Sequence, residues 1–91
     1  MKEENSSPAG KIRIERVQTG VRIEKRLLKV LKALAEYLDI SLGDLLEGLV
    51  LHAIEGRAPP LSPETLQRVD ALKQVYDMEY DSSVAHNFEE V

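Results

Sequence analysis

The amino-acid sequence predicts a mainly α-helical fold with one β-strand, assembled as a homodimer. Residues 16–23, RVQTGVRI, alternate polar and apolar side chains, which is the pattern of a half-buried strand. Leucines then recur at helical spacing over residues 24–38 and again over 42–54. No second segment repeats the strand pattern, and a lone strand cannot satisfy its own backbone hydrogen bonds. We therefore expect the strands of two chains to form an intermolecular antiparallel β-ribbon, covered by four helices.

The N-terminal end is expected to be irregular. Residues 1–10, MKEENSSPAG, are polar and contain a turn signal, so they predict a disordered arm and no signal peptide. Residues 11–15, KIRIE, favour an extended conformation, but Ile12 and Ile14 have the opposite parity to Val17 in the strand. A bend between residues 14 and 17 is therefore predicted.

Two amphipathic helices are predicted after the strand. The first, over residues 24–38, carries an apolar stripe roughly 160° wide, which is more than one partner element needs. Ser41 and Asp44 then resemble a capping box that starts the second helix, and Gly56 suits its C-terminal end. Gly48 lies on the polar side of this helix, where only close approach of another chain offers a reason for it.

Residues 57–91 are predicted to form a linker, a third helix and an acidic tail. Ser62 is a suitable N-cap and Pro63 a suitable first residue for a helix that continues to about residue 76. That helix would bury Leu66, Val69, Leu72 and Tyr76. The remaining residues are acidic and weakly patterned, which favours one further turn or disorder.

The net charge of −4 divides unevenly along the chain. Residues 11–32 hold eight basic and two acidic side chains, a net charge of +6, whereas residues 33–91 hold three basic and twelve acidic ones, a net charge of −9. This asymmetry favours a basic contact surface on an acidic body, with two ordinary solvated faces as the alternative.

Several classes of protein are disfavoured. The absence of cysteine excludes disulfides and thiolate zinc sites and fits a reducing cytoplasm, and no apolar run is long enough to span a membrane. His52 and His86 lack partners at ligand spacing, so no metal or other cofactor is expected. No catalytic constellation is evident, which argues against an enzyme, and the aromatic residues are too scattered for single-strand binding.

The run from Thr19 to Gly56, TGVRIEKRLLKVLKALAEYLDISLGDLLEGLVLHAIEG, resembles the ribbon-helix-helix family of DNA-binding repressors, of the Arc, MetJ and CopG types. The resemblance covers residues 16–56. It implies that residues 11–56 form a dimerisation and DNA-binding domain, with residues 57–91 as a C-terminal extension. The family inserts its paired strands into the DNA major groove.

The resemblance and the parity of the strand place Gln18, Gly20 and Arg22 at the DNA bases. Arginine suits guanine and glutamine suits adenine, whereas glycine only lets the backbone approach. For the phosphates, the family's helix N-terminus corresponds to Ser41, Leu42 and Gly43. Further predicted phosphate contacts are Arg16, Lys25, Arg26 and Lys29. The alternatives are a bulge at Gly20 and solubilising charges at the arginines and lysines.

These features predict a homodimeric, sequence-specific transcriptional repressor that binds double-stranded DNA. Two alternatives remain open. Residues 57–91 could bind a toxin, as the C-terminal extensions of antitoxins do, or the dimer could be a protein-interaction module that has lost DNA binding, which the acidic body and Gly20 allow.

Overall fold

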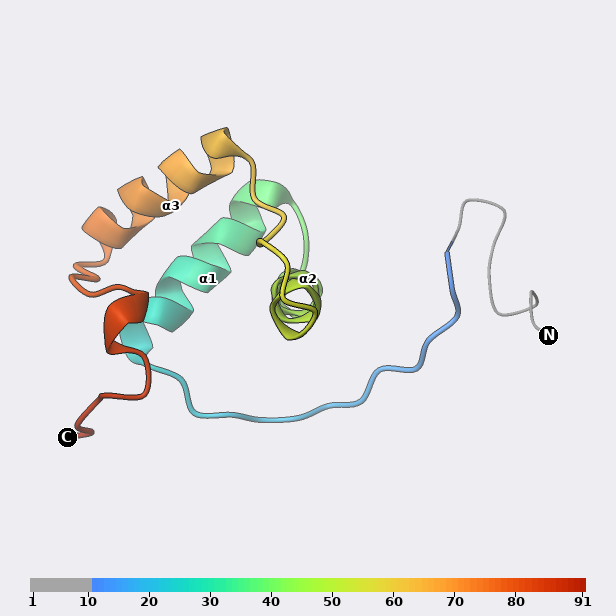
Figure 1. Cartoon of the computed structure of the whole chain (residues 1–91), viewed down its shortest axis with the longest axis horizontal. Coiled ribbons are helices and arrows are strands. Elements are labelled where there is room, and N and C mark those ends of the chain that lie inside the picture. Colours follow the sequence, from blue (N-terminus) through green and yellow to red (C-terminus); the bar gives the residue numbers. More distant parts are fainter. Residues whose placement is uncertain (1–10) are drawn as a thin grey trace.

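The computed structural model describes residues 11–91, which contain three α-helices: α1 (Lys25–Leu38), α2 (Leu42–Ile54) and α3 (Pro63–Val75). A short 3₁₀ turn, η2 (Ser82–Val84), follows them. Helices α1 and α3 lie side by side, and α2 turns away from the C-terminal end of α1 (Figure 1). The disordered arm predicted for residues 1–10 lies outside the described residues.

The predicted β-strand is wrong. Within residues 11–91 the structure has helices and extended chain but no strand and no sheet, so the β-ribbon architecture is not found. Val17 and Val21, expected on a buried strand face, are 80% and 77% exposed. The alternating pattern indicated extended backbone, and residues 13–24 are indeed drawn out, with no helix or strand assigned to them (Figure 1). A strand also needs a hydrogen-bonded neighbour, which no described part of this chain supplies.

Helix α1 begins and ends at acidic residues that sequence patterns did not single out as caps. The Glu24 carboxylate accepts hydrogen bonds from the backbone N–H groups of Arg26 and Leu27, at 3.1 and 3.0 Å. At the other end, Asp39 adopts a left-handed conformation with φ of 60°. The Ile40 N–H then bonds to the Ala35 carbonyl, so α1 ends in a Schellman motif with aspartate where glycine is commonest.

The predicted caps of α2 are confirmed. Ser41 Oγ accepts a hydrogen bond from the Asp44 N–H at 3.1 Å. Gly56 has φ of +70°, and the Arg57 N–H bonds to the His52 carbonyl at 2.8 Å. A left-handed backbone after the helix turns the chain so that the next N–H groups donate hydrogen bonds to the last carbonyls of the helix. Glycine adopts that conformation without a steric cost.

Helix α3 also begins as predicted, with Ser62 Oγ accepting from the Thr65 N–H at 3.1 Å and Pro63 as the first helical residue. Val69 and Leu72 pack against the core, but Leu66 remains 50% exposed, so its predicted burial is wrong. Thr65, Val69 and Leu72 are spaced i, i+4 and i+7 and form one narrow face, which excludes Leu66.

The core is small. Leu34 and Ala35 of α1 and Leu45 of α2 are buried, and five partly buried side chains surround them: Leu31, Leu38, Leu49, Val69 and Leu72. The Arg68 guanidinium adds a contact between α3 and α1, 4.4 Å from the centre of the Tyr37 ring. Helix α3 is therefore part of the folded body and not a free arm.

Candidate nucleic-acid interface

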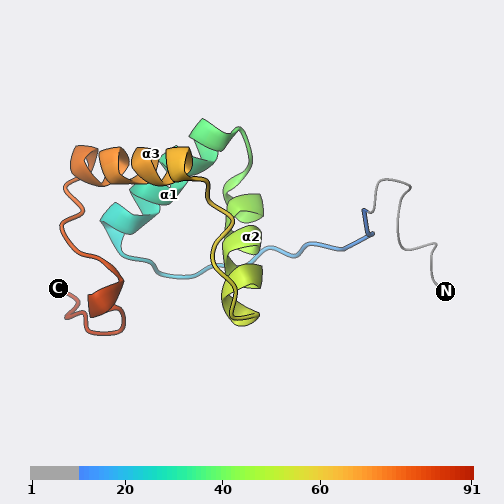
Figure 2. The ribbon, with the colours of Figure 1, turned by 45° about the horizontal axis from the view of Figure 1, so that its top comes forward.

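The basic residues gather on an exposed segment and on the start of α1. Residues 11–23 form an extended segment with every side chain exposed, and it runs outward from the first turn of α1 (Figure 1). The second view, turned by 45°, again shows this segment leaving the helical body (Figure 2). Positive charge therefore lies where a large partner can reach it.

The three residues predicted to contact bases are accessible. Gln18, Gly20 and Arg22 are all exposed. A Cβ built on Gly20 meets nothing within 4 Å, and its φ lies outside the left-handed region, so no close packing within the described chain requires glycine there. Neither a bulge nor a ribbon is present to explain Gly20, and nothing in the structure accounts for it.

Arg16 is paired with α2. Its Nε and Nη2 donate to the two carboxylate oxygens of Glu47, at 2.9 and 2.8 Å. The hydrogen bonds from Arg16 are the largest cause that lowers the pKa of Glu47. Because this pair is exposed, its contribution to stability is small, and a phosphate could replace Glu47 as the partner of Arg16.

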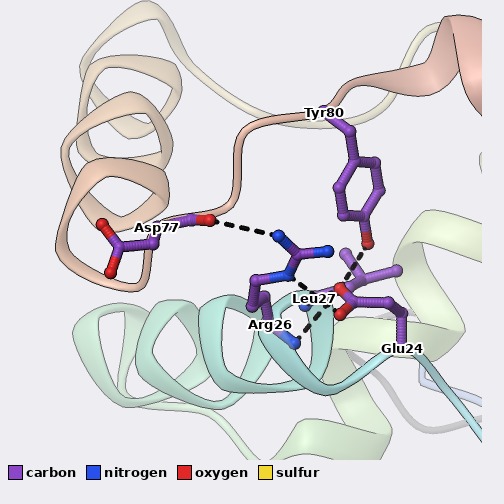
Figure 3. A network of polar contacts seen from close by, with 5 residues as sticks. All are labelled: Glu24, Arg26, Leu27, Asp77 and Tyr80. Carbon is purple, nitrogen blue, oxygen red and sulfur yellow. Dashed lines mark hydrogen bonds and ion pairs between the residues drawn. The ribbon is translucent and has the colours of Figure 1, made fainter. Parts of the chain in front are cut away.

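The first turns of α1 present the predicted phosphate-contact residues Lys25, Arg26 and Lys29, all of them exposed. Lys29 Nζ lies 5.9 Å from the centre of the Tyr76 ring. Arg26 is held more firmly, because Nε donates to Glu24 Oε2 at 3.0 Å and Nη1 to the Asp77 carbonyl at 3.4 Å (Figure 3). Arg26 is thus partly engaged by hydrogen bonds within the chain, whereas Lys25 is simply exposed and Lys29 has only the distant contact with the Tyr76 ring.

Glu24 is the centre of a polar network that joins the start of α1 to the C-terminal region (Figure 3). Tyr80 Oη donates to Glu24 Oε1 at 2.7 Å. Burial alone would raise the pKa of Glu24, but hydrogen bonds from Tyr80, the Leu27 N–H and Arg26 outweigh it and lower the pKa to about 2. Burial, followed by the hydrogen bond to Glu24, raises the pKa of Tyr80 to about 12.

The predicted phosphate site at the start of α2 is distant from the basic residues that open α1. Ser41, Leu42 and Gly43 lie beyond the C-terminal end of α1, and Lys25 and Arg26 lie at its beginning. A helix of 14 residues is about 20 Å long, so the two groups are far apart within one chain. Ser41 Oγ is already engaged with the Asp44 N–H, while Gly43 is exposed.

The most important contact that sequence patterns missed is the ion pair between Arg22 and Glu90. Only the opposite charges of the two chain regions could have suggested it. Within residues 11–91 no group of three potential metal ligands occurs, and no helix there has the length and apolarity to cross a membrane. His52 instead places Nδ1 2.8 Å from the Gly48 carbonyl oxygen.

Comparisons with family models, with curated proteins and with solved structures found no match to this chain. The resemblance to ribbon-helix-helix proteins therefore stays a prediction.

Proposed function

We propose that this chain is a cytoplasmic, homodimeric transcriptional regulator that binds double-stranded DNA at specific sites and represses transcription. The observation that carries the proposal is the exposed basic surface, formed by the extended segment and the start of α1, on an otherwise acidic body. A surface of this kind attracts the phosphate backbone of DNA and releases its counterions. The acidic body is repelled by the phosphates, so the rest of the protein stays away from the DNA.

Phosphate contacts come from Lys25, Lys29 and Arg16 in this proposal. An extended segment of 13 residues reaches at most about 45 Å, which exceeds one turn of the DNA double helix. Base contacts come from Gln18 and Arg22, whose side chains suit adenine and guanine edges. No sheet is needed for these contacts, because an extended basic arm can follow a groove by itself.

Dimerisation is supported by apolar surface that the single chain leaves uncovered. Val50, Leu51 and Ile54 of α2 are 53%, 54% and 74% exposed, and their positions fall on one side of the helix. A chain this short buries little apolar surface alone. A second copy is the occupant we propose, since a twofold interface uses the same patch on both chains. Two copies would also double the number of phosphate contacts.

The proposal is tested by DNA binding at several salt concentrations, with specific sites selected from a randomised duplex library. Lys29→Ala is expected to weaken specific and random DNA alike and to make the salt slope shallower by about one unit for each phosphate that Lys29 neutralises. Arg22→Ala is expected to cost about 1–3 kcal/mol on the specific site and to relax preference at one base pair per half-site. Arg57→Ala removes the same charge from the linker and serves as the control.

Two results would contradict the proposal. Binding weaker than the millimolar range at low salt would exclude a DNA-binding function, since nonspecific binding alone reaches about 10⁻⁴ M. Equal reductions of affinity in the Arg22, Lys29 and Arg57 variants would mean that net charge, and not this surface, governs the affinity. Either result would favour a protein-interaction module.

A further inference from the structure

The C-terminal tail, residues 77–91, returns to the basic surface at the start of α1. After α3 the chain turns back, and the C-terminus lies at the end of the molecule where α1 begins (Figures 1 and 2). The tail contains five acidic residues and no lysine or arginine. It is therefore the most acidic part of the chain, placed against the most basic part.

The contacts of the tail fall into an inner and an outer group. The inner group is the Glu24 network, in which Tyr80 Oη donates to Glu24 and Arg26 donates to the Asp77 carbonyl. The Tyr80 ring also lies 5.3 Å from the Arg26 guanidinium carbon. Tyr80 and Glu24 are both partly buried, so this group anchors the tail at one point.

The outer group consists of contacts made by the last residues of the tail, one of which is with Arg22, a predicted base-contact residue. The Phe88 ring packs edge-on against the Tyr80 ring, with centroids 5.2 Å apart and an interplanar angle of 77°. Glu90 then forms the ion pair with Arg22. The end of the tail and residues 22–26 together line one shallow hollow. Phe88 is 55% exposed, and the side chains of Arg22 and Glu90 are 85% and 69% exposed, so the outer group is held loosely.

We propose that the end of the tail is an autoinhibitory segment that competes with DNA for Arg22 and the start of α1. The proposal rests on the DNA-binding function put forward above and adds a regulatory element to it. The Glu90 carboxylate pairs with the Arg22 guanidinium, which would otherwise contact a DNA base or phosphate. The negative charges of Glu89 and Glu90 also repel DNA phosphates that approach this surface. DNA binding requires the outer group to detach, while the inner anchor at Tyr80 keeps the tail nearby.

The exposure of the outer contacts sets the size of the effect. Exposed ion pairs are weak, so the need to detach Glu90 is expected to lower DNA affinity about two- to fivefold relative to a chain without the pair. Screening by salt weakens the ion pair, so the difference should shrink as the salt concentration rises.

The test compares three variants of the 91-residue chain that each remove one negative charge. Glu90→Gln removes the partner of Arg22 and is expected to raise affinity for duplex DNA at low salt about two- to fivefold. Glu89→Gln makes the same change next to it without removing that contact, and Asp70→Asn makes it on an exposed position of α3. Both controls are expected to raise affinity less. Phe88→Ala, which changes no charge, should act in the same direction as Glu90→Gln.

A second measurement follows the docking without DNA. The NMR signal of the Arg22 Nε–H group should shift in Glu90→Gln and Phe88→Ala and stay in place in Asp70→Asn. Equal affinity gains in all three charge variants, or DNA binding unaltered by Glu90→Gln, would overturn autoinhibition. If no variant binds DNA, both the proposed function and autoinhibition are rejected, and the Arg22 signal still reports whether the tail docks.

Discussion

Tyr80 donates its hydroxyl hydrogen to the carboxylate of Glu24, 56 residues earlier in the chain, over a distance of 2.7 Å. The same carboxylate accepts the backbone N–H groups of Arg26 and Leu27 and thereby caps α1 (Figure 3). One side chain therefore begins the first helix and fastens the segment that follows the last. The ionisation of Glu24 should consequently be linked to the stability of the whole body.

Acidification is expected to destabilise the protein through Glu24. Its pKa is about 2 in the folded chain and lies near its ordinary value of 4.5 when unfolded. The pKa of Glu24 is lower in the folded chain than in the unfolded chain. Ionised Glu24 therefore stabilises the fold fully above about pH 4.5, and this stabilisation is lost as the pH falls towards 2. Urea unfolding between pH 2 and pH 7 measures the free energy of unfolding, and an NMR titration of the Glu24 carboxyl carbon measures the pKa of Glu24.

The matched variant for this prediction is Tyr80→Phe, which retains the ring and removes the hydroxyl. The variant should raise the pKa of Glu24 in the folded chain and leave its pKa in the unfolded chain unchanged. The free energy of unfolding should therefore fall less steeply below pH 4.5. An identical pH profile in the variant would mean that the Tyr80 hydrogen bond does not stabilise the charged form of Glu24.

Two glycines of the α2 region should respond to alanine in opposite directions. Gly56→Ala places a side chain at φ of +70° and should lower the free energy of unfolding by about 1–2 kcal/mol. Gly48→Ala lies inside α2, where a Cβ meets nothing within 4 Å, and should raise it by about 0.5–1 kcal/mol. Urea unfolding followed by circular dichroism measures both. A loss of stability in Gly48→Ala would point to another chain at that position.

Because the core is small, a single substitution that leaves a cavity in it should lower the free energy of unfolding substantially. Leu34 is 3% exposed at the contact between the helices, and Leu34→Ala is expected to cost about 2–5 kcal/mol. Val75→Ala truncates a side chain that is 68% exposed and should change stability by no more than about 0.5 kcal/mol. Thermal unfolding of both variants provides the comparison, and similar melting temperatures would show that the packing around Leu34 is not the main source of stability.

Self-association through α2 should depend on Ile54. Ile54→Lys places a charge on a side chain that is 74% exposed, so each chain should still fold while the dimer dissociates. Leu66→Lys on α3, at a position that is 50% exposed, is the control and should leave association unchanged. Sedimentation at several protein concentrations measures the effect. A wild-type chain that stays monomeric and folded at micromolar concentration would exclude the proposed dimer.

The three helices and the caps of α2 and α3 were determined by the sequence itself because their signals are local. Ser41 and Ser62 each bond to an N–H three residues later, and Gly56 ends α2 through bonds within five residues. These interactions require nothing from the rest of the chain. The leucine spacing likewise determined that α1 and α2 form and that Leu34 and Leu45 face the core.

Tertiary structure alone decided the features that depend on residues distant in sequence. Residues 16–23 have a strand pattern, yet a strand forms only where a neighbour accepts its hydrogen bonds, and the described chain offers none. Leu66 stayed exposed because α1 covers only the face of α3 that carries Val69 and Leu72. The tail reached Glu24 and Arg22 through Tyr80 and Glu90, across about 60 residues, where no local spacing rule applies.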